Sequence, residues 1–358
     1  MKVTAFDSGD ARAEKVVDFK ARLAANDARL IPPTRRSELD YYAPDHPYLR
    51  HARVKHFCVE SGGGDVVGAT TAIVDEHLPS DVGLVGLFQS TNDPAVANLV
   101  LGAARDYLAA AGKRVVKGPV DYNIWYRYRF KTGGFDRATV WGEPDNPDYY
   151  AKLWTEFGFT EEWTWRSYDL TRAHVELLLA NATAHTKDLA SAFRLERWTE
   201  PDEAKFRDFH RLVAGSYQGN PLATAIDFDE FSRIYGFFLY FLHVFQMHFV
   251  VLPDGTRIGV AFGMPDVAPA FRGAKGGDVT PDAVTRAGAA SDTFLFHTIA
   301  IGAEHRGNQA INIAFRDYLS AVGVTLPHYI GFLVREPKPI YIRLTPPSRH
   351  YALFTMNV

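Results

Sequence analysis

Three features of this sequence combine residue types that could do chemistry. Arg306 and Gly307 stand in a turn ahead of a helical segment, where unpaired backbone amides and the helix dipole favour an anion. His297 lies in an apolar, strand-like run, and a histidine of ordinary pKa can accept a proton near neutral pH. Residues 126–131 alternate aromatic and basic side chains, a pattern found in some proteins that bind single-stranded nucleic acid.

Each feature also has a purely structural interpretation. On a strand, alternation would put the three cations of residues 126–131 on one face and the rings on the other. We prefer this interpretation, a half-buried strand, to nucleic-acid binding. His297 could equally be a hydrogen-bonded core residue. The balance of 39 Lys and Arg against 42 Asp and Glu gives a net charge of −3, which supplies no broad field to attract nucleic acid. The single cysteine, Cys58, excludes an intrachain disulfide or a Cys-built zinc site and is expected in the core.

A diverged internal repeat indicates which helices and strands must position these residues. The eight residues that start at Arg105 return 211 positions later, at Arg316, with two differences. The same offset extends upstream into an apolar strand. Earlier in each copy, a Gly-containing turn, 61–65 or 253–256, joins two apolar runs as a hairpin. Each copy therefore predicts a strand, a helix, a hairpin, a strand, a turn, a helix and further strands.

The predicted fold class is α/β, with two tandem domains that each hold a mixed central sheet flanked by helices. We expect the domains at residues 1–170 and 193–358, joined by a linker helix over 171–192. The second copy holds extra residues at 265–291, a Gly, Ala, Pro and Asp-rich run that we expect to be a loop or a lid. A chain of 358 residues with 47% hydrophobic residues can give each half an ample core.

Neither a membrane span nor an export signal is predicted. The most apolar stretch, 234–252, is interrupted by two histidines and a glutamine, and it reads better as the end of a helix followed by a strand. The first residues lack the basic region and long apolar core of a signal peptide, so a cytoplasmic location is expected.

This order of elements resembles the GCN5-related N-acetyltransferase fold, and the duplication resembles the tandem-domain members of that superfamily. The first copy is most similar to bacterial YghO-like N-acetyltransferases. The segments that carry this resemblance are 47–52, 86–90 with 93–97, 117–120, 133–136, and 146–150 with 158–159. One departure is Gly118-Pro119-Val120-Asp121, where that group usually has Gly-Pro-Met-Asn.

The resemblance implies a coenzyme A site at a turn written Arg/Gln-x-x-Gly-x-Gly/Ala, whose backbone amides hold the pyrophosphate. The second copy keeps Arg306 and Gly307, but Gln309 and Ile311 replace the later small residues. In the first copy Asp93 brings a negative charge and the turn has no glycine. We therefore expect acetyl-CoA or acyl-CoA in the second copy, with the first as a scaffold or part of the acceptor site. The predicted donor-site residues are Ile299, Ala300, Ile301, Arg306, Gly307, Asn308, Gln309 and Ala310.

The reaction that the resemblance implies is acyl transfer from a thioester to an amine. The amine must lose a proton, the oxyanion must be stabilised and the thiolate must be protonated. Backbone amides around Ile299 and Ile301 are expected to take the carbonyl oxygen. The candidate bases are His297 and Glu336, for which a solvated salt bridge is the structural alternative. Tyr341 is the candidate acid, with core packing as its alternative.

Aromatic side chains are the candidates for substrate binding. A surplus of rings would suit an apolar acyl chain or an aromatic acceptor, although burial of each is worth ~1.5–3 kcal/mol and makes core formation the default explanation. The predicted substrate-binding residues are Tyr122, Trp125, Tyr126 and Tyr128 in the first copy and Tyr235 and Phe238 in the second.

We expect an N-acyltransferase that moves an acetyl or longer acyl group from coenzyme A to a small-molecule amine. It would act without a metal, a membrane or nucleic acid, as a monomer or homodimer. Two alternatives stay open. The donor could be acyl carrier protein or aminoacyl-tRNA, although the balanced charge argues against tRNA. The protein could also be a non-catalytic binding protein, which the degraded phosphate turns of both copies favour.

Overall fold

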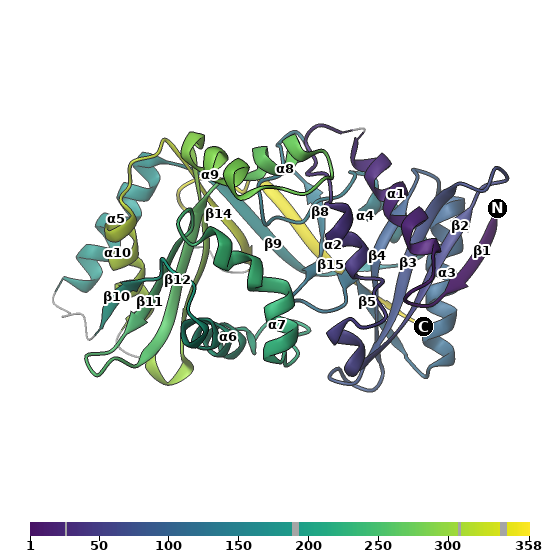
Figure 1. The fold of residues 1–358 in the computed structure, drawn as a ribbon, viewed down its shortest axis with the longest axis horizontal. Helices are drawn as coiled ribbons and strands as arrows, with labels where there is room; N and C mark the ends of the chain where they lie inside the picture. The colour runs from purple at the N-terminus through teal and green to yellow at the C-terminus, as the bar shows by residue number, and fades with distance from the viewer. Residues whose placement is uncertain (26, 188–192, 307–308, 337–341) are drawn as a thin grey trace. The chain divides into compact units, whose positions relative to one another are not determined.

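A computed structural model describes residues 1–358 except 26, 188–192, 307–308 and 337–341. It divides into two compact units, shown in Figure 1. Unit 1 comprises Met1–Arg166, Ala268–Val279 and Arg349–Val358, and unit 2 comprises Ser167–Val267 and Thr280–Ser348.

These units differ from the sequence-based domains in two segments. Residues 268–279 and 349–358 belong to the second copy by sequence but to unit 1 by packing. The boundary between the units falls inside one strand, β9 (Thr160–Thr171). The domains 1–170 and 193–358 stay a prediction about the two copies in the sequence. The compact units divide the chain differently, because unit 1 includes residues 268–279 and 349–358.

The sheet of unit 1 follows the order β1-β2-β3-β4-β5-β15, and β8 also pairs with β15. Its neighbours are antiparallel except β4 and β5, which run parallel. The strands are β1 (Lys2–Phe6), β2 (Ala52–Glu60), β3 (Val66–Asp75), β4 (Val82–Ser90), β5 (Val115–Gly118), β8 (Phe130–Gly133) and β15 (Arg349–Asn357), and β6 (Val120–Asp121) pairs separately with β7 (Arg127–Tyr128). The predicted hairpin joins β2 to β3, and Gly64 supplies its positive φ of 84°.

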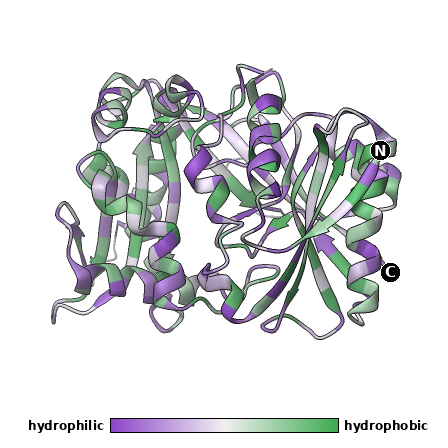
Figure 2. Cartoon of the chain, turned by 45° about the vertical axis from the view of Figure 1, so that its right-hand side comes forward, coloured by the Kyte–Doolittle hydropathy of each residue, from purple (hydrophilic) through white to green (hydrophobic). Residues whose placement is uncertain are grey.

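The helices of unit 1 are α1 (Arg12–Ala25), α2 (Arg35–Asp40), η1 (Pro47–Arg50), α3 (Pro94–Ala110), α4 (Tyr150–Phe157) and α8 (Ala268–Ala274). Among them, α1, η1, α3 and α4 contact this sheet. Val100 and Leu108 of α3 share one core cluster with Trp154 of α4 and Phe354 of β15. Cys58 is buried in β2, as expected of a core residue. Figure 2 shows that apolar residues concentrate along the strands.

Unit 2 repeats the same sheet pattern in the order β14-β13-β12-β11-β10. Its strands are β10 (Arg194–Arg197), β11 (Gln246–Val251), β12 (Arg257–Pro265), β13 (Thr293–Ile301) and β14 (His328–Arg335). Only β13 and β14 run parallel. The helices are α5 (Arg172–Thr186), α6 (Glu203–Tyr217), α7 (Phe228–Tyr235), η2 (Gly236–Phe241), α9 (Pro281–Ala290), η3 (Ala303–His305) and α10 (Ala310–Val322). The predicted α/β fold with two copies of one mixed-sheet pattern is confirmed.

Two local predictions were wrong. The run 265–291 is no loop, because it forms α8 and α9, and Thr280 caps α9 by accepting a hydrogen bond from the backbone N–H of Ala283. Residues 126–131 do not form one strand, because Arg129 has a φ of 72° between β7 and β8. The alternation is broken there, and the Arg129 guanidinium lies 4.5 Å from the ring centre of Trp165.

Across the described ranges, no helix combines the length and the apolar character needed to span a lipid bilayer.

Candidate functional site

The strand β13 pairs with β12 along most of its length and with β14 over its first residues. Its pairing with β12 skips one residue, because Phe262 lies opposite Thr298 and Gly263 lies opposite Phe296. His297 is therefore the extra residue of a β-bulge. Among the described residues, the parallel register with β14 runs from Thr293 and His328 to Phe296 and Gly331. Within the described strands, the backbone of β13 after residue 296 is thus outside the β13–β14 ladder.

The helix that follows β13 is not capped by the side chain of its own N-cap residue. Its N-cap residue, Gln309, has a φ of 58°, and its side chain makes no capping hydrogen bond. The first turn of α10 carries no acidic residue. The first backbone N–H groups of a helix have no partner inside it, so this start suits an anion.

Arg306 and the end of β13 are held together. The Nε of Arg306 donates a hydrogen bond to the carbonyl oxygen of Ile301 at 2.9 Å, and the side chain is exposed. Ala310 packs with the buried Ile301 in one core cluster. Among the predicted donor-site residues, Ile299 is half-buried and Ala300 is buried. Gly307 and Asn308 lie outside the described residues.

In unit 1 the start of the corresponding helix, α3, is capped by its own N-cap side chain. Asp93 is the N-cap of α3, and its carboxylate accepts a hydrogen bond from the backbone N–H of Ala95 at 2.9 Å. Pro94 occupies the first turn and has no N–H to offer. The negative charge of Asp93 therefore occupies the place at which an anion would bind.

The backbone of β4, the strand before α3, is also occupied by a partner where it leaves β5. The parallel register of β4 with β5 ends at Leu84, and the strand then bulges at Leu87, whose φ is 49°. The backbone N–H of Leu87 donates to the carboxylate of Asp121 at 2.5 Å. A Cβ on Gly86 would collide with the carbonyl of Val120, so glycine permits β6 to approach the gap.

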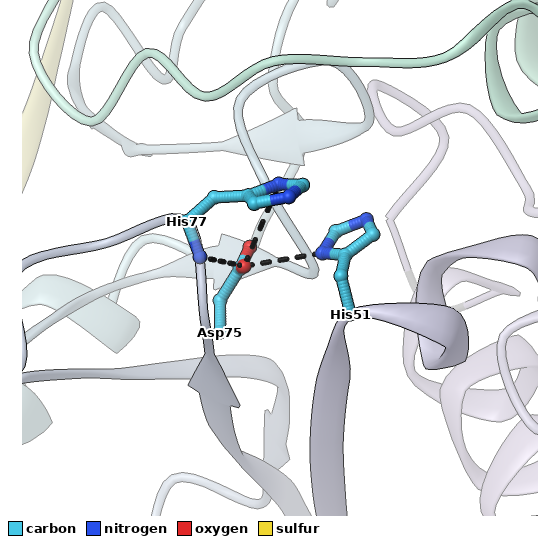
Figure 3. Close-up of side chains that lie close together, drawn as sticks. All are labelled: His51, Asp75 and His77. Carbon is cyan, nitrogen blue, oxygen red and sulfur yellow. Dashed lines mark hydrogen bonds and ion pairs between the residues drawn. The ribbon is translucent and has the colours of Figure 1, made fainter.

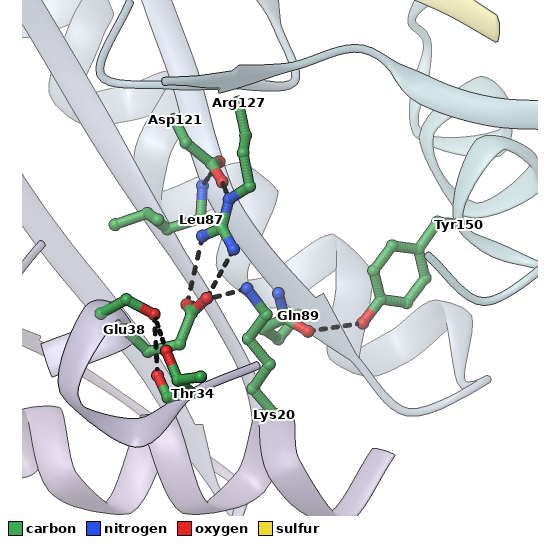
Figure 4. Close-up of polar contacts among 9 residues, drawn as sticks. Lys20, Thr34, Glu38, Leu87, Gln89, Asp121, Arg127 and Tyr150 are labelled. Atoms are coloured by element: carbon green, nitrogen blue, oxygen red, sulfur yellow. Dashed lines mark hydrogen bonds and ion pairs between the residues drawn. The ribbon is translucent and has the colours of Figure 1, made fainter. Parts of the chain in front are cut away.

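Buried charges reinforce this closure, as Figure 4 shows. Glu38 is 3% exposed and accepts hydrogen bonds from Lys20 and Arg127. Arg127 also pairs with Asp121 at 3.0 Å. Burial alone would raise the pKa of Glu38, but the charges of Arg127 and Lys20 outweigh it and lower the pKa to about 2. A small pocket beside Leu87 is lined partly by Lys20 and Glu38.

The sequence reasoning missed this cluster. Lys20, Glu38 and Asp121 lie on α1, α2 and β6, and their spacing along the chain does not bring them together. The one available signal was the departure at Val120-Asp121 from the usual Met-Asn of the resembling group.

His297, a candidate base, does not keep an ordinary pKa. Its Nδ1 lies 2.7 Å from the hydroxyl oxygen of Thr298, and its ring lies 4.7 Å from that of Phe262. Burial lowers the pKa of His297 to about 4, so the imidazole is neutral at pH 7. The premise of an ordinary pKa was wrong, because burial disfavours the charged imidazolium.

The other two chemical candidates follow β14 in the sequence. Glu336 is exposed and follows the last residue of β14. Tyr341 lies outside the described residues, so its predicted role as the acid stays a prediction.

Four predicted substrate-binding rings belong to unit 1. Tyr122 and Trp125 are buried, at 0% and 3% exposure, and behave as core residues. Tyr122 stacks on Tyr48 with ring centres 4.5 Å apart. Tyr126 and Tyr128 are half-buried.

The remaining two rings belong to unit 2 and approach the bulge. The rings of Tyr235 and Phe238 lie 5.7 Å apart. The ring of Phe238 lies 5.4 Å from that of Phe262, which contacts His297. A continuous set of aromatic rings therefore leads from α7 and η2 to the bulge of β13.

Comparisons with known proteins give two partial sequence matches. No family profile matches this sequence. The chain is 29% identical over 157 residues to "Bacterial ceramide synthase" of Caulobacter vibrioides (strain NA1000 / CB15N), covering 42% of this chain and 41% of that protein. It is 26% identical over 164 residues to "Protein YghO" of Escherichia coli (strain K12), covering 43% and 42%. The match thus spans about two fifths of each relative.

A comparison of folds covers nearly the whole chain. A tandem GNAT protein from the clavulanic acid biosynthesis pathway superposes with a TM-score of 0.52 and 12% identity, covering 99% of this chain and 98% of that one. At this identity the match shows a shared fold.

Proposed function

Because this chain has the tandem GCN5-related N-acetyltransferase fold, we propose that it is an N-acyltransferase that uses an acyl-CoA donor in unit 2. One observation carries the proposal. In unit 2 the bulged strand leaves its parallel neighbour and leads to an uncapped helix start, whereas unit 1 closes both positions with Asp121 and Asp93.

The residues of unit 2 have the properties that an acyl-CoA would require. The amides at the start of α10 and the exposed Arg306 favour the pyrophosphate. Backbone amides of β13 beyond Phe296 favour the thioester oxygen, which becomes negative when an amine attacks the carbonyl carbon. The C–N bond forms as the C–S bond breaks, and the thiolate takes up a proton.

The acceptor amine must reach this site in its neutral form. Burial lowers the pKa of His297 to about 4, so its imidazole is neutral at pH 7. His297 is better suited to hydrogen-bond the substrate, while Glu336, which is exposed, remains the proposed base. The name of the Caulobacter relative and the rings of Tyr235, Phe238 and Phe262 favour a long-chain donor or acceptor over a short one.

Ligand-linked stability tests the donor site. Thermal unfolding of the full chain is recorded with acetyl-CoA and with a long-chain acyl-CoA, followed by mass spectrometry of mixtures that contain candidate amines. A donor at about 100 times its Kd should stabilise unit 2 by about 2.7 kcal/mol. Arg306→Ala should reduce the shift, because it removes the exposed cation beside the helix start.

Arg286→Ala is the matched control, since Arg286 is an exposed arginine on α9 that the proposal does not use. It should keep the wild-type shift. A folded protein that responds to none of the acyl-CoAs would contradict the proposal and favour the carrier-protein donor or the non-catalytic alternative.

A further inference from the structure

Unit 1 carries a cluster of two histidines and one aspartate that the proposed function does not use. His51 directly precedes β2, Asp75 is the last residue of β3, and His77 follows two residues later. The antiparallel register sets Ala52 opposite Asp75, so the hairpin itself brings the three side chains together. Figure 3 shows the carboxylate beside the two rings, which stack with their centres 4.2 Å apart. One ligand atom from each residue lies within 4.8 Å of the others.

The carboxylate of this cluster is fixed from several sides. Asp75 is 1% exposed. Its Oδ2 accepts a hydrogen bond from the hydroxyl of Tyr48 at 2.8 Å, and its Oδ1 accepts one from the backbone N–H of His77 at 2.9 Å. Tyr48 is itself fully buried. Such outer partners orient a ligand carboxylate in known metal sites.

The separations of the ligand atoms are close to those of a metal site. Oδ1 of Asp75 lies 3.1 Å from Nδ1 of His51 and 3.9 Å from Nδ1 of His77. Tetrahedral zinc with bonds of about 2.0–2.2 Å holds its ligand atoms about 3.3–3.5 Å apart. The side chain of His77 is 40% exposed, so it has room for the small rotation that would close the difference.

We propose that His51, Asp75 and His77 bind one divalent transition-metal ion of the Zn²⁺ class. Two imidazole nitrogens and one carboxylate suit such an ion better than Mg²⁺ or Ca²⁺, which prefer oxygen ligands. The exposed side of His77 leaves a further position for water or a substrate group. This site departs from the expectation that the protein uses no metal.

Metal binding is tested on the full-length protein without a histidine tag, after treatment with a chelator. Titration calorimetry with Zn²⁺ and visible absorption with Co²⁺ should report one ion per chain at pH 7.5. His77→Gln should lower the affinity at least tenfold, because it removes one of three ligands from an exposed position. Tyr48→Phe should lower it less, because the ligand carboxylate remains.

His243→Gln is the matched control, since His243 is an exposed histidine of unit 2 that contacts Thr285 at 2.9 Å. It should bind the ion like the wild type. Circular dichroism checks that each variant is folded. Failure of the wild type to bind Zn²⁺ or Co²⁺ at micromolar concentration would overturn the proposal. Equal binding by His77→Gln would do the same, as would binding that is unchanged at pH 5.5, where protons must compete for imidazole.

Discussion

At the scale of single residues, Glu38 stabilises the buried charge cluster beside β4 of unit 1. Its pKa is lowered from 4.5 to about 2, so its stabilising effect is complete above the unfolded-state pKa and is lost as the pH falls through the folded-state value. Between pH 7 and pH 3, we expect the wild type to lose about 2 kcal/mol more stability than Glu38→Gln does. At pH 7 the variant should be less stable by about 3 kcal/mol, because Lys20 and Arg127 lose their buried partner.

Denaturant unfolding of unit 1 at the two pH values measures both effects. Glu60→Gln is the control, because Glu60 pairs with Lys15, whose side chain is 59% exposed, and such a surface pair is worth about 1 kcal/mol or less. A difference between the wild type and Glu38→Gln that is the same at pH 7 and pH 3 would contradict this account.

At the scale of elements, the two helices α3 and α10 differ at their first residue. Asp93 caps α3, and Gln309 leaves α10 uncapped. Gln309→Asp would bring a negative charge to the start of α10 and should weaken acyl-CoA binding at least fivefold by repulsion. Gln309→Asn has nearly the same shape without the charge, and both residues tolerate the left-handed backbone. Calorimetric titration of the two variants should therefore separate them, and equal affinities would count against an anion at this helix.

Much of this pattern could be predicted from the sequence, because strands, turns and helices leave local signals. The Gly-containing turns, the block repeated at Arg105 and Arg316, and the strand before Arg306 all indicated the observed elements. The helix α9 was also readable, since Thr280 and Pro281 form an ordinary helix start.

Features that depend on distant segments were not predictable. The sequence of residues 349–357 does not indicate that they pair with β5 and β8. The residues near Asp121 likewise do not indicate that its carboxylate accepts a hydrogen bond from the amide of Leu87. The Asp75 cluster was missed for the same reason, because His51 and Asp75 are brought together by strand register. Bulges and cross-strand neighbours are decided by tertiary packing rather than by local propensity.

At the scale of the whole molecule, the last strand stabilises the unit to which the first residues belong. Phe354 of β15 is 1% exposed and packs with Phe130 and Trp154. Phe354→Ala should destabilise unit 1 by about 3–5 kcal/mol, and hydrogen exchange should rise in β5 and β8. Phe249→Ala is the counterpart, because Phe249 is 1% exposed in β11 of unit 2. If Phe354→Ala increased hydrogen exchange in β11 and β12 but not in β5, the result would show that β15 does not stabilise unit 1.

The position of β15 has a consequence for how the protein is made. When residues 1–171 have left the ribosome, every described strand of unit 1 is available except β15 at Arg349–Asn357. The nascent sheet must therefore wait, with the edge of β5 unpaired, until nearly all of the second copy has been translated. Exposed sheet edges of this kind attract foreign strands, so aggregation during synthesis should be more severe when translation stalls before residue 349 than when it stalls after residues 349–357 have left the ribosome.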